Sequence, residues 1–380
     1  MKIAVLAHIR HAIAEPFMGG MEAHCHQLVT ALRRRGHAVT LFAAGGSDLP
    51  DTVHTCPHPC ENVLPYDTWQ GSDELRAYQQ QAFAKAWRAI DGGRYDVVHN
   101  NSLFTPVLDW ARKSGRAMVT SQHVPPFSMM RDAVGRSHGD LSQQFTVTSR
   151  QQLAMWDAVR GSNMKVVHNG IDLNDWPVAD QRGERLVWFG RITPTKGLRE
   201  TVAAARIAQA SLDIVGTVED ELYFNEFVTP YLNDRIRYCG HMSGTALRHK
   251  VAHALAAVVT PMWDEPFGLV AAEAMVAGVP VIAFDRGAMR EVLGSCGQLV
   301  PAGDVSALAR AMSKAQFLDG ASCRDRIAKH FSVDQMLDGY EARYEAAISG
   351  AARIARPAAV VPVAPTASAS STSSTVALLA

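Results

Sequence analysis

The sequence has no excess charge of either sign and no long apolar run. Its 380 residues include 37 Lys and Arg and 37 Asp and Glu, so the formal net charge at pH 7 is +0. Nucleic-acid binding usually needs a basic excess, and we therefore expect no nucleic acid as a partner. No apolar stretch approaches the ~18 residues that a membrane-spanning helix requires. We expect a cytoplasmic protein, while loose contact with the inner face of a membrane stays open.

Two sequence motifs are also missing, and the cysteines are few. The first predicted strand is not followed by Gly-x-Gly-x-x-Gly, the pattern typical of dinucleotide-binding domains. No Asp-x-Asp occurs anywhere, so we expect no metal ion to clamp a diphosphate. The 6 scattered cysteines favour free thiols in a reducing compartment.

The pattern that organises the chain lies between residues 255 and 284. Residues 255–259 and 279–284 are short apolar runs with β-branched residues, typical of buried parallel strands. Between them, a helix is predicted over residues 267–277. Pro266 fits its first position, because the missing N–H costs nothing there. The unit is therefore a strand, a loop, a helix and a second strand.

Two carboxylates in this unit have a spacing that suits a nucleotide sugar. Glu265 lies at the mouth of the predicted helix and Glu273 on its body, about 12 Å apart along a helix axis. Such a ligand has a hydroxyl-rich ring at each end, and each carboxylate can accept hydrogen bonds from one ring. The free amides at the helix start, at Phe267, Gly268 and Leu269, would face the anionic diphosphate. Two incidental surface glutamates are the alternative reading.

The N-terminal half has a second phosphate-facing pattern. Residues 2–7 are predicted as a buried strand, and a helix is predicted to end near residue 35. Between them, Gly19 and Gly20 bring backbone amides near a phosphate, although paired glycines also make simple tight turns. Farther along, His123 follows a strand predicted at residues 117–120, on the sheet edge where ligands of α/β folds bind.

The C-terminal half repeats the alternation of strands and helices from residue 186 onward. Arg191 and Lys196 lie just before a helix predicted to start at Leu198. Two cations placed there can neutralise a diphosphate leaving group, which we favour over the alternative of two surface cations near a turn.

Together these segments resemble family 4 of the retaining glycosyltransferases over roughly residues 1 to 345. The resemblance rests on Glu265-Pro266-Phe267-Gly268-Leu269-Val270 with Glu273, Gly19-Gly20-Met21-Glu22, Asn169-Gly170-Ile171-Asp172, and Gly190-Arg191 followed by Lys196-Gly197. Three positions depart from the family, and the first is His168, which stands where proline is common. Thr195 replaces an acidic residue, and Ala288 replaces the second glycine of a pair.

The resemblance implies an α/β protein of GT-B fold, with two Rossmann-like domains facing across a cleft. We expect an acceptor-side domain at residues 1–175, a donor domain at 176–333, a helix crossing back at 334–349 and a disordered tail at 350–380. The tail has the low-complexity composition of segments that cannot bury a core.

The resemblance also implies the activity and the residues that perform it. The protein would move a sugar from a nucleoside diphosphate sugar, most simply a UDP or GDP sugar, to an acceptor hydroxyl, without a cofactor. His123 and Glu265 would orient the sugar, and Glu273 would hold the ribose. Arg191, Lys196 and amides near Gly20 and Gly268 would stabilise the leaving group. Neither the sugar nor the acceptor follows from the sequence.

Three alternatives stay open. A sugar-nucleotide epimerase can share this architecture, and a non-catalytic nucleotide-sugar binder is a second possibility. The third concerns residues 54–60, where His54, Cys56, His58 and Cys60 alternate. Structural zinc ligands usually come as separated pairs, so a loop over the acceptor cleft is favoured over a zinc site.

Overall fold

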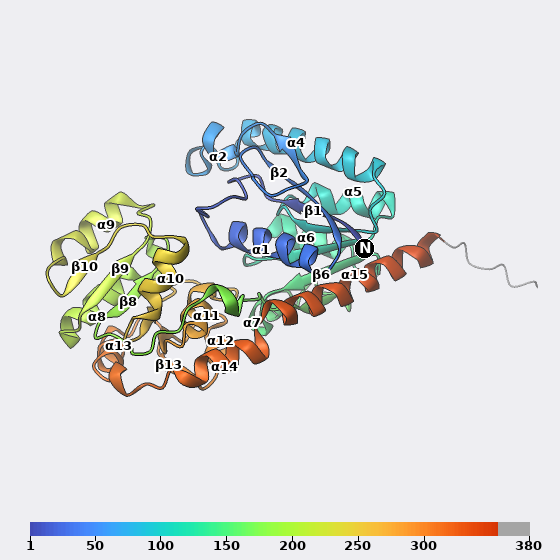
Figure 1. Cartoon of the computed structure of the whole chain (residues 1–380). Coiled ribbons are helices and arrows are strands. Elements are labelled where there is room, and N and C mark those ends of the chain that lie inside the picture. The colour runs from blue at the N-terminus through green and yellow to red at the C-terminus, as the bar shows by residue number, and fades with distance from the viewer. Residues whose placement is uncertain (356–380) are drawn as a thin grey trace, which may run out of the picture.

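The computed structural model describes residues 1–355, which form two α/β domains (Figure 1). Most of the predicted tail, residues 356–380, lies outside the described residues. No helix within residues 1–355 combines the length and the apolar character needed to cross a membrane.

The N-terminal domain is built on a parallel seven-stranded sheet with the strand order β3-β2-β1-β4-β5-β6-β7. Its strands are β1 (Lys2–Ala7), β2 (Ala38–Ala44), β3 (Thr52–Cys56), β4 (Val97–Asn101), β5 (Met118–Gln122), β6 (Gln143–Val147) and β7 (Met164–Val166). Its helices are α1 (Gly20–Arg34), α2 (Cys60–Val63), α3 (Tyr66–Trp69), α4 (Asp73–Gly92), α5 (Pro106–Ser114), α6 (Ser128–Arg136) and α7 (Arg150–Ala154).

The C-terminal domain is built on a parallel six-stranded sheet with the order β10-β9-β8-β11-β12-β13. Its strands are β8 (Leu186–Phe189), β9 (Leu212–Val215), β10 (Ile236–Tyr238), β11 (Ala257–Val259), β12 (Val281–Phe284) and β13 (Gly297–Val300). Its helices are α8 (Leu198–Ala208), α9 (Glu221–Phe227), α10 (Gly244–Ala252), α11 (Leu269–Val276), α12 (Met289–Leu293), α13 (Val305–Met312) and α14 (Ala321–His330).

Helices cover both faces of each sheet, which is why most strands are apolar runs. In the N-terminal domain, α1 packs on one face together with α15 (Val333–Ala355), the last helix of the described chain. Helices α4, α5 and α6 pack on the other face. In the C-terminal domain, α11, α12 and α14 cover one face and α8, α9 and α13 the other. The two predicted Rossmann-like domains are therefore confirmed.

The chain crosses between the domains twice, and the two crossings are paired. Ile171, on the outward crossing, forms a parallel bridge with Ser332, and its amide donates to the carbonyl of Phe331 at 2.8 Å. Gly170 allows this approach, because a Cβ there would lie 2.6 Å from the Cα of Val333. Helix α15 then returns along the N-terminal domain, as Figure 1 shows.

Several predicted bounds were wrong. Residues 52–56 form the edge strand β3 instead of a loop, and β13 was not predicted. Helix α15 continues to Ala355 instead of ending at residue 349, because its last turns still pack against the N-terminal domain. Gly350 lies against the backbone of Leu141, where a Cβ would come within 2.3 Å of the carbonyl. Residues 350–355 of the predicted tail are therefore helical.

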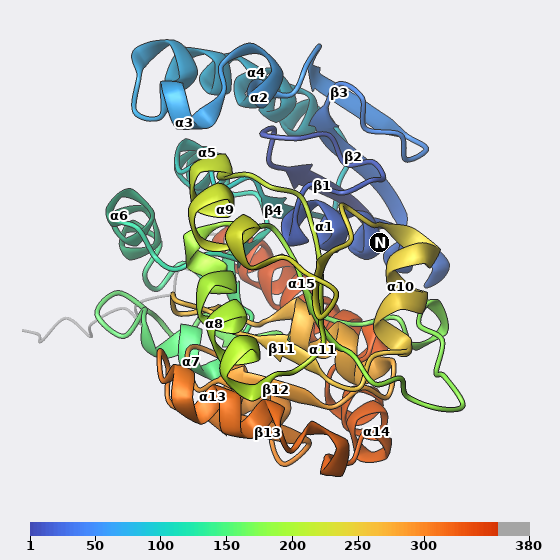
Figure 2. The same ribbon diagram turned by 90° about the vertical axis from the view of Figure 1, so that its left-hand side faces the viewer.

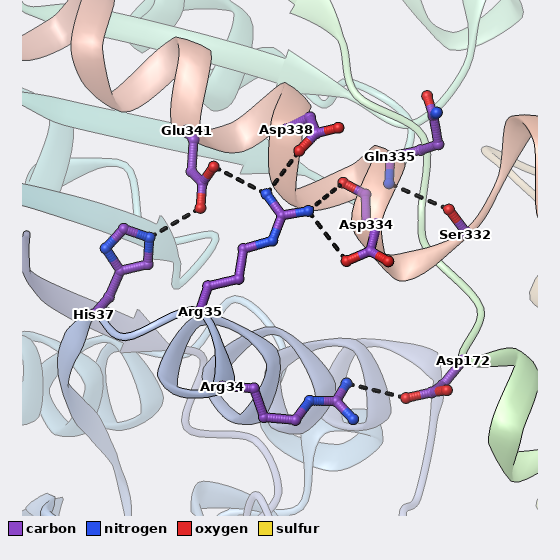
Figure 3. A network of polar contacts seen from close by, with 9 residues as sticks. All are labelled: Arg34, Arg35, His37, Asp172, Ser332, Asp334, Gln335, Asp338 and Glu341. Atoms are coloured by element: carbon purple, nitrogen blue, oxygen red, sulfur yellow. Dashed lines mark hydrogen bonds and ion pairs between the residues drawn. The ribbon is translucent and has the colours of Figure 1, made fainter.

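A group of ion pairs ties α15 to the end of α1 (Figure 3). Arg35 donates to the carboxylates of Asp338 at 2.6 Å, Glu341 at 3.0 Å and Asp334 at 3.1 Å. One residue earlier, Arg34 donates to Asp172 on the outward crossing at 3.0 Å. These bonds link the last turn of α1 to both crossings.

We expect Arg35→Gln to lower the free energy of unfolding by about 1–2 kcal/mol, because three carboxylates lose a shared, charged donor. Urea unfolding followed by circular dichroism measures the change. Arg76→Gln is the matched control, since Arg76 makes a single exposed ion pair with Asp73 on α4. We expect it to cost no more than about 0.5 kcal/mol. Equal losses for both variants would contradict an anchoring role for Arg35.

Candidate active site

A cleft of about 1380 Å³ lies between the two domains. Its walls come from the loops that follow the strands of both sheets, including His8 after β1, His123 after β5, Gly190 after β8 and Thr260 after β11. In Figure 2 the two domains lie one above the other, with the N-terminal domain at the top. The carboxyl ends of parallel strands are where ligands of open α/β sheets bind, so this cleft is the candidate active site.

Glu265 is held firmly at the floor of this cleft. Its Oε2 accepts hydrogen bonds from Lys196 Nζ and from the indole N–H of Trp263, both at 2.8 Å. The backbone is fixed as well, since the amide of Ala288 donates to the Glu265 carbonyl at 2.9 Å. The structure thus brings together two predicted residues, Glu265 and Lys196. It adds Trp263, which belongs to none of the predicted motifs.

Helix α11 begins later than predicted. Gly268, in the left-handed region with φ 93°, is its N-cap, and Leu269 is its first residue. Pro266 therefore lies outside the helix. The amides that open the helix are those of Leu269 and Val270, both of which line the cleft. The left-handed backbone favours glycine here, and a Cβ on Gly268 would also displace the end of the Met289 side chain, whose Cε would lie 2.0 Å away.

The two glycines of the N-terminal loop lie close to this helix start. A Cβ on Gly20 would come within 2.8 Å of Leu269 Cδ1, so α1 and α11 approach each other across the cleft. Gly19 precedes α1 as its N-cap, in extended conformation. Both glycines line the cleft, as predicted for residues that bring amides near a phosphate.

The remaining predicted donor residues differ in their surroundings. Arg191 lines the cleft and pairs with Glu219 at 3.0 Å, whereas Lys196 pairs with Glu265. The Phe267 side chain is 2% exposed and packs against Phe331, so its ring belongs to the core of the C-terminal domain. A role for Phe267 at the ligand is limited to its backbone.

Glu273 lies about one turn along α11 from its first residue, Leu269, and also lines the cleft. Burial raises the pKa of its carboxyl to about 7, although the nearby positive charge of Arg248 opposes this rise. A carboxyl with such a pKa changes charge near neutral pH, which an exposed glutamate does not.

His123 lies in a cluster of buried histidines. Its ring is 4.3 Å from that of His24 between centroids, and its Nε2 is 3.3 Å from Asn101 Oδ1. Burial, followed by repulsion from His24 and His8, holds the pKa of His123 well below its usual value. The ring is therefore neutral at physiological pH. His24 was not predicted, although it follows Gly19-Gly20-Met21-Glu22 by two positions.

Glu22 is a further buried carboxylate beside the cleft that the prediction left without a role. Its Oε1 lies 3.2 Å from His8 Nε2. Burial raises the pKa of Glu22, but the bond to His8 outweighs that effect, so the pKa falls below its usual value.

The alternating His and Cys residues of the 54–60 segment do not form a metal site. Across residues 1–355, no group of three His, Cys, Asp or Glu side chains is placed to hold a metal ion. His54 Nε2 is 3.1 Å from the Ser47 carbonyl, and Cys56 and Cys60 are buried in the apolar core beside α4. His54 and His58 are exposed whereas Cys56 and Cys60 are buried, so the four candidate ligands do not converge.

Comparison with known families shows the class of protein to which this fold and cleft belong. Residues 18–175 match the family model described as Glycosyltransferase Family 4, and residues 183–316 match that described as Glycosyl transferases group 1. These two matches cover most of the chain, which therefore belongs to the group 1, family 4 glycosyltransferases.

Three known proteins show the range of this likeness. The phosphatidyl-myo-inositol mannosyltransferase of Mycobacterium leprae is 27% identical over 317 residues, covering 77% of this chain and 83% of the relative. The structure of sucrose-phosphate synthase from Thermosynechococcus elongatus has a TM-score of 0.74 at 23% identity, covering 91% of this chain and 98% of that chain. HepE of Anabaena, solved with UDP and glucose, has a TM-score of 0.68 at 19% identity, covering 91% and 99%. The two structures share the GT-B fold with this chain.

The backbone around Glu265 leaves no room for a side chain at Gly287. This residue has φ 58°, and a Cβ on it would lie 2.4 Å from both the nitrogen and the oxygen of Glu265. We expect Gly287→Ala to lower the free energy of unfolding by about 2–4 kcal/mol, through left-handed strain and this clash. Denaturant unfolding measures the loss.

Gly303→Ala is the matched control. Gly303 has φ 80°, but a Cβ there meets nothing within 4 Å. We expect that variant to lose only about 1 kcal/mol, the cost of the backbone conformation alone. If the two alanine variants were equally stable, the close approach of Gly287 to Glu265 would contribute nothing to the loss of stability.

Proposed function

We propose that this protein transfers a hexose from a nucleoside diphosphate sugar to an acceptor hydroxyl, with retention of configuration and without a metal ion. The observation that carries the proposal is the pair formed by Lys196 and Glu265 at the mouth of α11, with Glu273 farther along the same cleft wall. A cation and an oriented carboxylate lie where the diphosphate and the sugar would meet.

The sugar end of the donor is assigned to Glu265 and His123. The Lys196 ammonium and the Trp263 indole fix the Glu265 carboxylate, and the unbonded lone pairs can accept from sugar hydroxyls. Glu273 would accept from the ribose hydroxyls at the nucleotide end. HepE, whose fold this chain shares, binds UDP and glucose, which supports a nucleotide sugar as donor.

The leaving diphosphate is assigned to the cations and the amides of the cleft. Lys196, Arg191 and the first amides of α11 would stabilise the charge that develops as the sugar–phosphate bond breaks. In a front-face reaction the acceptor oxygen bonds to the anomeric carbon from the side that the phosphate leaves. The departing phosphate oxygen takes the acceptor's proton, so no separate base is required.

The test is a screen of UDP and GDP hexoses, first by thermal shift and then by transfer. A donor at a hundred times its dissociation constant should stabilise the protein by about 2.7 kcal/mol. With that donor and a panel of sugar and inositol acceptors, we expect a glycoside whose anomeric configuration, read by NMR, matches the donor. The rate should be unchanged in EDTA.

Three other outcomes would replace this proposal. Isomerised donor without nucleotide release would indicate an epimerase. Saturable binding without turnover across the acceptor panel would indicate a nucleotide-sugar binder. Activity lost in EDTA and restored by magnesium or manganese would exclude the metal-independent mechanism.

We expect the glutamine substitutions at Glu265 and Glu273 to impair different kinetic parameters. A hydrogen bond to a charged group is worth roughly 1.5–3 kcal/mol. Glu273→Gln should raise the donor KM tenfold or more with a smaller change in kcat, because the ribose is remote from the reacting bond. Glu265→Gln should lower mainly kcat, because a slight misplacement of the reacting sugar is felt in the transition state.

Steady-state kinetics over a donor titration, with calorimetry for the affinity, measures both effects. Glu226→Gln serves as a surface control and should change neither parameter, because Glu226 is exposed on α9 and does not line the cleft. If Glu273→Gln kept its affinity but lost its rate, the roles of the two carboxylates would be reversed.

The raised pKa of Glu273 makes donor affinity depend on pH. The ribose hydroxyls need the ionised carboxylate as an acceptor, and below its pKa of about 7 the free protein holds this carboxyl protonated. The donor dissociation constant should therefore rise as pH falls, by roughly tenfold between pH 8 and pH 6. For folding the sign is opposite: this group favours the folded state at low pH and loses that contribution as pH rises toward 7.

Calorimetric titration of the donor between pH 5.5 and 8 measures this dependence. Glu273→Gln should bind weakly and without the pH dependence, because the amide does not titrate. The buried histidines do not confound the profile, since the pKa of His24 is lowered by burial to about 3. A flat profile for the unchanged protein would show that Glu273 does not contact the donor.

A further inference from the structure

A chain of hydrogen bonds runs from helix α15 to His123, the predicted sugar-facing histidine. The hydroxyl of Tyr344 on α15 is 2.7 Å from His99 Nδ1. The opposite ring nitrogen, His99 Nε2, is 3.2 Å from Asn101 Oδ1. The same Oδ1 is 3.3 Å from His123 Nε2. His99, Asn101 and Tyr344 are at most 2% exposed, whereas His123 lines the cleft.

The direction of these bonds follows from the Tyr344 hydroxyl. Burial raises the pKa of Tyr344 well above its usual value, so the hydroxyl keeps its one proton. Within residues 1–355, His99 Nδ1 is the hydroxyl's single hydrogen-bond partner. Tyr344 therefore donates to His99 Nδ1, because otherwise a buried O–H would have no acceptor, which is costly.

The rest of the chain is then determined step by step. A neutral histidine carries one ring proton, and the pKa of His99 is lowered by burial to about 3, so this ring is neutral. With Nδ1 accepting, His99 Nε2 holds the proton and donates to Asn101 Oδ1, with Ser121 Oγ also 3.0 Å away. Asn101 must therefore present its oxygen, not its amide nitrogen, to both histidines.

That orientation decides which nitrogen of His123 faces the cleft. Because Asn101 Oδ1 can only accept, His123 Nε2 donates to it, and Nδ1 is left with a lone pair. Within residues 1–355, His123 Nδ1 has no hydrogen-bond partner, and this atom is not fully buried. Nδ1 is therefore the atom of this ring that is open to the cleft.

We propose that Tyr344, His99 and Asn101 are positioning residues that hold His123 in the tautomer presenting an acceptor nitrogen to the cleft, where Nδ1 receives a hydrogen bond from a hydroxyl of the donor sugar. The identity of the ligand rests on the proposed function. The C-terminal helix thereby takes part in setting the chemistry of a site that it does not line.

The first test reads the tautomer directly, without any ligand. Protein labelled with [¹⁵N]histidine gives different nitrogen shifts for protonated and unprotonated ring atoms, and His123→Ala assigns the signals. We expect a protonated Nε2 and an unprotonated Nδ1 for His123 across neutral pH. A protonated Nδ1 would overturn the proposal.

The second test removes the hydroxyl that starts the chain. In Tyr344→Phe the bias on His99 is lost, since either tautomer now leaves one ring nitrogen unpaired. We expect mixed His123 signals and a roughly tenfold lower kcat/KM for the donor, the value of one lost hydrogen bond. Tyr340→Phe is the matched control. Tyr340 lies one turn earlier on α15, is equally buried and also packs its ring against His99, but its hydroxyl bonds to Ser121 and His24 and to neither ring nitrogen of His99. It should keep the His123 tautomer.

A double-mutant cycle separates positioning from general destabilisation. If Tyr344 acts through His123, Tyr344→Phe should change kcat/KM little in the His123→Ala background. An equal loss in both backgrounds would show a merely structural role and overturn the proposal. If no nucleotide sugar is turned over at all, the proposed function fails, and the nitrogen shifts of the unchanged protein still decide the tautomer.

Discussion

The pairing of the two crossings is the constraint on which the rest of the structure depends. Ile171 and Ser332 lie side by side although far apart in the sequence, so the two crossings form one hydrogen-bonded strip between the domains. That strip turns the carboxyl ends of both sheets toward the same space. Without this pairing, the Gly20 loop and the start of α11 would not be held close together on opposite sides of the cleft.

Several charged residues that line the cleft are paired with a residue from a separate segment. Lys196 balances Glu265, Arg191 balances Glu219, and His8 lies against Glu22. Partly buried charges need such partners, because removal from water is costly. An anionic ligand that recruits Lys196 or Arg191 must therefore compete with a carboxylate already in place. The cleft is thus arranged so that ligand binding exchanges one ion pair for another.

Much of the fold was readable from local patterns, but the fine structure of the site was not. The alternation of apolar runs and helical segments predicted both sheets, and Glu265 and Lys196, predicted from separate motifs, prove to be bonded to each other. The start of α11 was wrong because the left-handed backbone of Gly268 outweighed the preference of Pro266 for a first helical position. Nothing in the local sequence indicates that Tyr344 bonds to His99, 245 positions away, since that contact exists only once α15 has folded back.

The return of α15 to the first domain has a consequence for how the protein is made. Met336, Leu337, Tyr340, Tyr344 and Ala347 belong to the same apolar cluster as Ile3 and Val5 of β1. Synthesis runs from the N-terminus, so the first strand leaves the ribosome long before the helix that covers it. Helix α1 can cover part of that sheet face early, but the part that α15 covers stays exposed until nearly the whole described chain has been translated. During synthesis the second domain can therefore close its own core while the first is still incomplete.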